Sequence, residues 1–158
     1  MFRELMRPGQ AVPREECVEI LEQQLRGVLS VQGDDGYPYG IPLNHYYCPE
    51  DGRLYFHSGK KGHKADAIQR CGKASFCVWD DGVRNEGEWA LNFRSVIVFG
   101  RIEIVEDPEK LADIARRLSR KFTDDEEFIE FEIGRSGPHT LMFALVPEHM
   151  TGKRVREQ

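Results

Sequence analysis

The sequence lacks the residue spacings that most directly indicate metal, redox or nucleotide chemistry. Its four cysteines, Cys17, Cys48, Cys71 and Cys77, form no C-x-x-C pair, so a zinc knuckle and a thioredoxin-type redox motif are excluded. We expect all four to be free thiols. No H-E-x-x-H pair occurs among the histidines, and we expect no metal site. The P-loop spacing G-x-x-x-x-G-K-[ST] and the dinucleotide spacing G-x-G-x-x-G are also missing.

Long apolar runs and an excess of positive charge are missing too. No run reaches the length of a membrane span, and the start, Met-Phe-Arg-Glu-Leu-Met-Arg-Pro, has no apolar signal-peptide core. We therefore expect a soluble, cytoplasmic protein with no membrane partner. The formal net charge of −5 disfavours general nucleic-acid binding and suits a small anionic ligand held by a local basic cluster. A length of 158 residues indicates a single domain over residues 1–158.

One segment has the composition of a phosphate-binding turn. Residues 54–68, Leu-Tyr-Phe-His-Ser-Gly-Lys-Lys-Gly-His-Lys-Ala-Asp-Ala-Ile, pass from an apolar strand through a basic loop into a helix. Ser58 offers a hydroxyl, two glycines expose backbone N–H groups, and Lys64 is one of several basic residues. The N-terminal end of the helix directs its dipole to the same place. An ordinary lysine–glycine surface turn explains this segment, taken alone, about as well.

The remaining pattern is mostly that of β-strands. We predict strands over residues 28–31, 37–47, 53–57, 73–79, 89–105 and 140–146, and helices over 14–24, 64–70, 108–122 and 124–133. Cys77 lies in an apolar run and is predicted to be in the core. Strand 89–105 is too long for a flat sheet, and Gly100 within it indicates a bulge or bend. About six antiparallel strands should therefore bend through a small closed barrel.

Several separated blocks carry a resemblance to a known family. In chain order they are Gly-Asp-Asp-Gly-Tyr-Pro-Tyr-Gly-Ile-Pro-Leu-Asn (33–44), the basic segment (54–68), Phe-Cys-Val (76–78), Phe-Arg-Ser-Val-Ile-Val-Phe-Gly-Arg (93–101) and His-x-Thr-Gly-Lys (149–153). Together they resemble the FMN-binding split barrels that are similar to pyridoxamine 5′-phosphate oxidase, and within them the nitroimidazole-resistance branch. The resemblance covers nearly the whole chain.

The resemblance implies a mainly β, α+β fold: a six-stranded antiparallel split β-barrel with flanking helices. It also implies a homodimer that binds FMN in clefts between the subunits. The FMN phosphate would be held by Ser58, His63 and Lys64. The isoalloxazine ring would lie along Pro42, Leu43, Asn44 and His45. Contacts to the flavin or to the partner subunit would come from Arg94, Ser95 and Val96.

Three of the candidate positions keep alternatives. His57 would stand near the reactive edge of the flavin as a catalytic residue, or it is a hydrogen-bonded surface residue. His45 either lines the groove or faces solvent, and Arg94 either touches the flavin or pairs with a carboxylate at the dimer interface. True pyridoxamine-phosphate oxidases have Arg-Lys where this chain has His63-Lys64, and an arginine-rich tail that residues 153–156 do not match. Oxidation of a B6 vitamer is therefore not expected.

These features lead to one functional hypothesis and two alternatives. The leading hypothesis is an FMN-dependent oxidoreductase that reduces nitro compounds or another small-molecule acceptor, with NAD(P)H or a second protein as electron donor. The first alternative is a flavin-binding carrier or sensor without turnover, because few residues resemble dedicated acid–base machinery. The second is a protein of the same fold with deazaflavin or haem as cofactor. Residues 80–88 and 123–139 are predicted to form walls of the substrate pocket.

Overall fold

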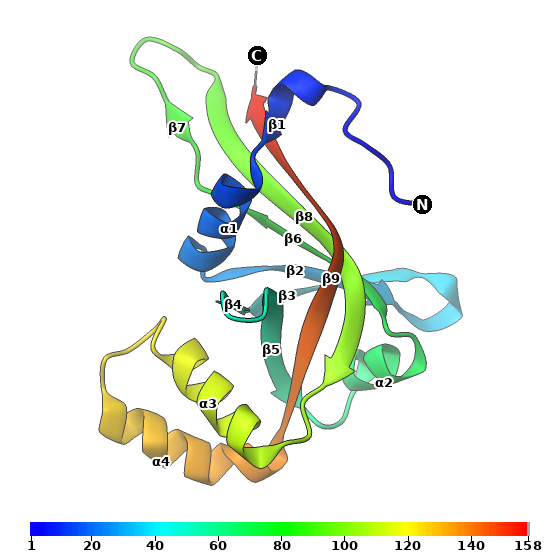
Figure 1. The fold of residues 1–158 in the computed structure, drawn as a ribbon, viewed down its shortest axis with the longest axis vertical. Helices are drawn as coiled ribbons and strands as arrows, with labels where there is room; N and C mark the ends of the chain where they lie inside the picture. Colours follow the sequence, from blue (N-terminus) through cyan, green and yellow to red (C-terminus); the bar gives the residue numbers. More distant parts are fainter. Residues whose placement is uncertain (158) are drawn as a thin grey trace.

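A single curled antiparallel sheet organises the chain, and the computed structural model describes it over residues 1–157 (Figure 1). The sheet has the strand order β3-β2-β6-β8-β9-β5-β4, with β1 paired to β9 and β7 paired to β8. The strands are β1 (Ala11–Val12), β2 (Arg26–Gln32), β3 (Pro38–Asn44), β4 (Tyr46–Cys48), β5 (Arg53–Gly59), β6 (Lys73–Trp79), β7 (Val83–Arg84), β8 (Leu91–Ile104) and β9 (Thr140–Arg156).

Helices lie outside the sheet. They are α1 (Arg14–Gln23), α2 (His63–Arg70), α3 (Pro108–Ser119) and α4 (Glu126–Ser136), with short 3-10 turns η1 (Pro8–Gln10), η2 (Asp34–Gly36) and η3 (Gly137–His139). The predicted class, an antiparallel β structure with flanking helices, is confirmed. The strand count is higher than predicted for two reasons. Segment 37–47 divides into β3 and β4, and two very short strands, β1 and β7, were not predicted. Within residues 1–157, no helix combines the length and the apolar character needed to cross a membrane.

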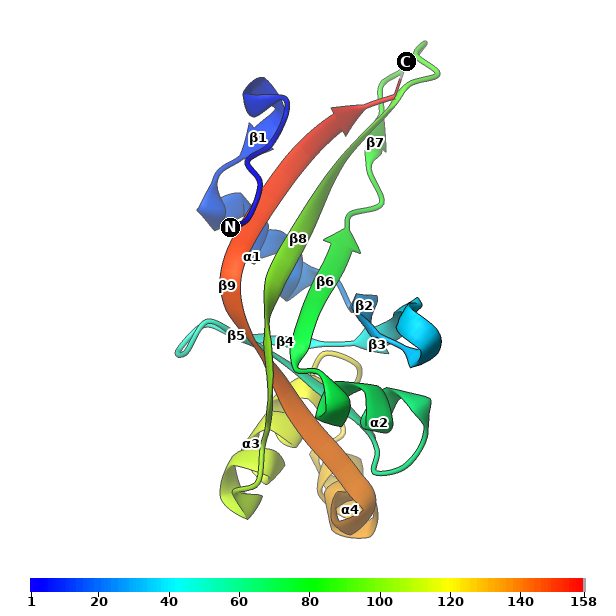
Figure 2. The same cartoon turned by 90° about the vertical axis from the view of Figure 1, so that its right-hand side faces the viewer.

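The two longest strands, β8 and β9, run side by side along the length of the molecule (Figures 1 and 2). Their register shifts between Phe99 and Gly100, which confirms the predicted bulge. Gly100 is required there because a Cβ would collide with the carbonyl oxygen of Val146. β9 extends well past the predicted residues 140–146. Its second half contains Pro147 and polar residues, and it is held in place by its pairing with β8 rather than by its own apolar pattern.

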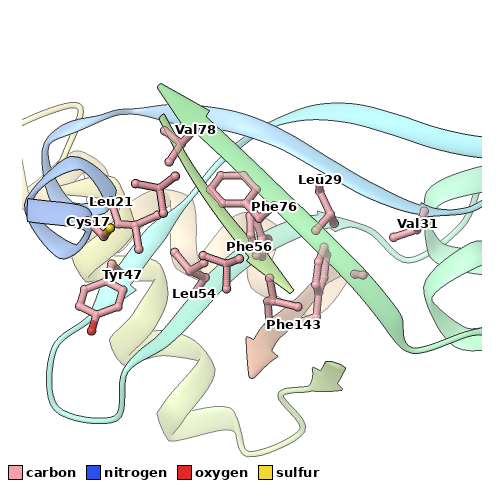
Figure 3. Packing of buried hydrophobic residues seen from close by; sticks show 14 of the residues in the cluster. Cys17, Leu21, Leu29, Val31, Tyr47, Leu54, Phe56, Phe76, Val78 and Phe143 are labelled. Atoms are coloured by element: carbon pink, nitrogen blue, oxygen red, sulfur yellow. The ribbon is translucent and has the colours of Figure 1, made fainter. Parts of the chain in front are cut away.

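The main core fills the inside of the curl (Figure 3). Phe56 packs edge-on to Phe76 at 5.0 Å and stacks with Phe143 at 5.4 Å, measured between ring centroids. Cys77, predicted to be in this core, is instead half-buried on the outer face of β6, between the inward residues Phe76 and Val78. The prediction was wrong because β6 carries apolar residues on both faces, so alternation did not reveal which face points inward.

A second, smaller core lies beneath the α3–α4 hairpin, on the other side of β5. It contains Tyr55, Ile114 and Met142. In Figure 1 the hairpin lies below β4 and β5, whereas α2 lies on the far side of β5. Arg117 of α3 anchors the hairpin through an ion pair of 2.7 Å with Glu50 in the β4–β5 turn. β5 therefore separates two environments, and successive residues along it face one or the other.

Candidate functional site

The connection from β5 to α2 concentrates positive charge around a glycine turn. Gly62 precedes α2 with φ of +114°, a backbone conformation that favours glycine over residues with a side chain. Lys64 lies in the first turn of α2 and is half-buried, and burial lowers the pKa of its ammonium group. Within residues 1–157 no carboxylate pairs with it. A half-buried lysine without a counter-charge, at the positive end of a helix, can hold an anion.

His63 is held in position by the hairpin between β2 and β3. Its ring stacks on Tyr39 with 4.0 Å between ring centroids and 13° between the ring planes. Its Nε2 atom lies 3.7 Å from Oδ2 of Asp34, whose other oxygen accepts a hydrogen bond of 3.0 Å from Arg70. An anion that approaches His63 would therefore compete with the Asp34 carboxylate for the imidazole. Its charge is already shared with Arg70, which reduces that competition.

His57 and Ser58 point to opposite sides of β5, as strand geometry requires. Ser58 is half-buried, and its hydroxyl donates to the carbonyl oxygen of Gly59 at 2.9 Å. His57 lies on the side of β5 that α3 and α4 cover. His57 itself is exposed at the end of the strand. The pKa of its imidazole is lowered from the ordinary value, first by loss of solvation on the side that packs against the chain and second by the positive charge of Lys64. The structure thus places Ser58, His63 and Lys64 in one connection, with His57 on the opposite side of the strand end. Their roles stay predictions.

Three of the four candidates from residues 42–45 lie on β3, and their side chains do not share one face of the strand. Pro42 is exposed, Asn44 is half-buried, and both pair with residues of β2. Leu43 is packed against the main core instead. A planar ligand on the outer face of β3 would therefore meet Pro42 and Asn44 through their side chains. It could meet Leu43 only through the main chain.

The structure corrects both alternatives for His45, which neither lines a groove nor faces solvent. It is fully buried, and its Nε2 donates to the carbonyl oxygen of Leu21 in α1 at 2.7 Å. Burial and the charge of Lys121 lower its pKa to about 3, so the ring is neutral. The chain leaves β3 after Asn44, and this break turns the His45 ring inward. We assign His45 a structural role between α1 and the sheet.

The β8 candidates also divide between two faces. Val96 is fully buried in the main core, so only its backbone could contact a ligand. Ser95 is half-buried, opposite Trp79 of β6. Arg94 binds Asp80 through Nε at 2.9 Å and Glu16 of α1 through Nη1 at 3.2 Å, and these carboxylates raise its pKa. Arg94 therefore pairs with carboxylates of its own chain.

The outer face of the sheet carries a groove of about 500 Å³. Ser30 pairs with Gly40 on one side and with Ser75 on the other, which makes a row of small residues across β3, β2 and β6. Ser75 then pairs with Phe99 of β8, and Phe2 of the N-terminal segment lies 5.4 Å from the Phe99 ring, between centroids. Charged residues, Lys73, Arg101 and Glu148, also line the groove. A floor of small residues beside two aromatic rings leaves room for a planar ring.

Sequence reasoning missed most of a second concavity, beside His57. An apolar cavity of about 310 Å³ lies between α3, α4, β5 and β9, and a shallower one of about 450 Å³ adjoins it at the ends of β5 and β9. The only signal in the sequence was the prediction that residues 123–139 form a pocket wall. Parts of α4 and η3 do so. Within residues 1–157, no cluster of three or more His, Cys, Asp or Glu side chains could hold a metal ion.

Solved structures with this fold cover most of the chain. A candidate 5-nitroimidazole antibiotic resistance protein from Bacteroides thetaiotaomicron is 21% identical, with a TM-score of 0.76 over 92% of this chain and 87% of that one. A conserved hypothetical protein from Mycobacterium tuberculosis is 20% identical, with a TM-score of 0.79 over 95% and 90%. An FAD-binding protein from Mesorhizobium loti is 22% identical, with a TM-score of 0.65 over 92% and 97%.

At these identities the structural similarities establish the fold, which is the predicted split barrel. No curated protein matches the sequence. The family model described as pyridoxamine 5′-phosphate oxidase matches residues 13–154, which is nearly the whole chain. The chain therefore belongs to the pyridoxamine 5′-phosphate oxidase family.

Proposed function

We propose that this protein binds FMN, with the phosphate at the β5–α2 turn. The observation that carries the proposal is Lys64, a half-buried cation without a carboxylate partner at the N-terminal end of α2. A phosphate monoester there would receive charge-assisted hydrogen bonds from Lys64 and backbone amides, and these are about twice as strong as neutral ones. Ser58 and His63 would complete the shell. Membership of the family supports this assignment.

The proposed place for the isoalloxazine ring is the outer face of the sheet. The row of Gly40, Ser30 and Ser75 leaves room for a planar group, and Pro42 and Asn44 lie on β3 beside it. Such a slot, mostly apolar with a few polar groups, is typical of cofactor sites. Binding of FAD by the Mesorhizobium loti protein supports a flavin in general. We favour FMN over FAD because a helix N-terminus with Lys64 beside it best matches a terminal phosphate.

The proposed activity is reduction of nitro compounds or another small acceptor, with NAD(P)H or a second protein as donor. A bound flavin supplies the electron transfer itself. His57 would hold the acceptor by a hydrogen bond or give it a proton. Its lowered pKa leaves the imidazole mostly neutral at pH 7. A neutral ring still carries one N–H donor, so orientation of the acceptor is the simpler of the two roles.

The protein is also proposed to be a homodimer. Ile97 and Phe99 on β8 and Trp79 on β6 are apolar side chains that stay more than a third exposed. They share the outer face of neighbouring strands, and a contiguous apolar surface of this kind usually receives a partner. A second copy of the chain would cover it and close the groove over Ser30 and Ser75.

One experiment separates the proposed enzyme from a flavin carrier or sensor. The purified protein is mixed with NADH or NADPH, and absorbance near the flavin band is followed before and after addition of a nitro acceptor. An enzyme bleaches and then recovers its absorbance through repeated cycles. A flavin band that neither donor bleaches, and whose chemically reduced form passes no electrons to the nitro acceptor, supports the carrier, which the small number of acid–base residues favours. A colourless protein, or a haem or deazaflavin spectrum, contradicts the proposal.

A further inference from the structure

The cavity beside His57 has an apolar interior. Its walls are Leu111 and Ala115 of α3 and Ile133 of α4, and its floor is formed by Ile129 and Met142. The two floor residues are each 1% exposed and belong to well-packed regions, so the floor does not need a ligand to be in place. A volume of about 310 Å³ is at the lower end for small-molecule sites and fits one or two aromatic rings.

The entrance to this cavity is polar and rich in hydrogen-bond donors. The adjoining shallow cavity shares His57, Ser136 and Thr140 with the inner one and adds Arg135 and His139, with no carboxylate. The exposed carbonyl at the end of α4 is already used, because the Thr140 hydroxyl donates to the Ser136 carbonyl at 2.8 Å. Lys64 is near enough to act electrostatically on His57 and adds to the positive potential.

One carboxylate, Glu132, lines the inner cavity and forms an ion pair with Arg135. It lies 2.7 Å from Nη2 of Arg135, and the same nitrogen donates to its other oxygen at 2.8 Å. Arg135 therefore contacts Glu132 through a single nitrogen. The guanidinium also lies over the Phe131 ring, 5.7 Å from its centroid. A guanidinium has five donors in a fixed plane, so Nη1 and Nε are left for a ligand at the entrance.

We propose that the α3–α4 groove, defined as these two adjoining cavities, binds a small molecule that has an aromatic body and an anionic group. The body would fill the space above Met142, and the anionic group would lie among Arg135, His139 and His57. An aromatic carboxylate or sulfonate has this shape. Binding in this groove does not require a bound flavin. If FMN is bound as proposed above, His57 is positioned at the junction, and the groove would select acidic aromatic acceptors.

The test uses a pair of fluorescent probes on the full chain. 1-Anilinonaphthalene-8-sulfonate carries the anionic group, and N-phenyl-1-naphthylamine is the same ring system without it. We expect both to bind saturably, about one per chain. Ala115→Trp should weaken both by at least about tenfold because the indole fills the cavity. Arg135→Gln should weaken only the sulfonate, by about fivefold to tenfold, for the loss of one partly exposed charged contact.

The matched control is Arg156→Gln. Arg156, like Arg135, is an exposed arginine that pairs with a glutamate, Glu88, at 2.9 Å, but it lies at the far end of β9. It should leave both probes unaffected. If Ala115→Trp does not unfold cooperatively, Ser119→Trp at the half-exposed edge of the cavity replaces it. Unchanged binding in the filled variant, or displacement of the probes by FMN or phosphate, would place the probes elsewhere and overturn the proposal. Equal effects of Arg135→Gln on the two probes would overturn its anionic part.

Discussion

Loss of solvation lowers the pKa of His57, and the positive charge of Lys64 lowers it further. Two residues predicted for different tasks, phosphate binding and turnover, are thus coupled electrostatically across the end of β5. A phosphate dianion beside Lys64 would cancel much of its field. Binding of the cofactor would then change the protonation of the proposed catalytic residue.

This coupling predicts a shift of the His57 pKa upward on binding of FMN or inorganic phosphate. The titration can be followed by NMR of the imidazole protons with and without ligand. Lys64→Gln should raise the His57 pKa without ligand, and phosphate should then have little further effect. The assignment of phosphate to this turn would be wrong if phosphate left the His57 titration unchanged in the unmodified protein.

Lys64→Glu should lower the affinity for FMN by at least about tenfold. It removes a charged hydrogen bond worth roughly 1.5–3 kcal/mol and places a negative charge beside a dianion. Riboflavin, which has no phosphate, should be affected much less. Lys110→Glu serves as the control, because it makes the same change of charge on a different helix, α3, where Lys110 pairs with Asp51 and lies outside the β5–α2 turn. Equal weakening of FMN and riboflavin would show that Lys64→Glu disturbs the fold and not a phosphate site.

His57→Ala should keep the flavin and reduce turnover. The side chain points away from the phosphate turn, toward the α3–α4 groove, so FMN should stay bound. Reduction of a nitro acceptor should fall by about 10²-fold if His57 gives a proton. In that case the rate of the unmodified protein should rise as pH falls toward the lowered pKa of His57. An unchanged rate would make His57 structural, and simultaneous loss of flavin would make it part of the cofactor site.

The buried ammonium group of Lys121 should give the free energy of unfolding an unusual pH dependence. Its Nζ donates to the carbonyl oxygens of Gln24 at 2.8 Å and His45 at 2.6 Å, and burial lowers its pKa from 10.5 to about 8. Between these values the unfolded chain binds more protons than the folded chain, so this group makes the free energy of unfolding rise with pH. Above 10.5 both states are deprotonated and the gain is complete.

Lys121→Met should reveal this effect by comparison. It leaves two carbonyls without their donor, which costs roughly 1–3 kcal/mol per buried unsatisfied group at most. Urea unfolding at pH 7.5 and pH 9.5 should show the unmodified protein gaining stability relative to the variant at the higher pH. A difference that stays constant between the two pH values would mean that Lys121 titrates normally in the folded protein.

Much of the fold could be predicted because local signals agreed with tertiary structure. β6 has the predicted bounds, and the bulge in β8 follows from one glycine. The failures have a common cause, because they concern residues whose environment is set by distant segments. β9 is extended by β8, His45 is turned inward by α1, and the cavity beside His57 exists only because α3 and α4 pack over β5.

The candidate site was predictable to a similar degree. The phosphate-site candidates Ser58, His63 and Lys64 lie close together in the sequence, so the strand–turn–helix pattern alone brings them together. The residues on β3 and β8 were predicted as continuous runs, but a strand presents alternate residues to opposite faces. Leu43 and Val96 consequently point into the core, while Pro42 and Ser95 do not. The phase along a strand is readable only when one face is clearly polar, and the outer face of β6 and β8 carries Trp79, Ile97 and Phe99 among its polar residues.

The most direct test of the central claim is a native mass spectrum of the protein purified without added ligand. We expect two chains carrying two FMN molecules, because the flavin groove is proposed to close only when a second copy covers Ile97 and Phe99. Release under denaturing conditions should then give the mass of FMN. A monomer at micromolar concentration, or a dimer that carries FAD, haem or no cofactor, would contradict the account.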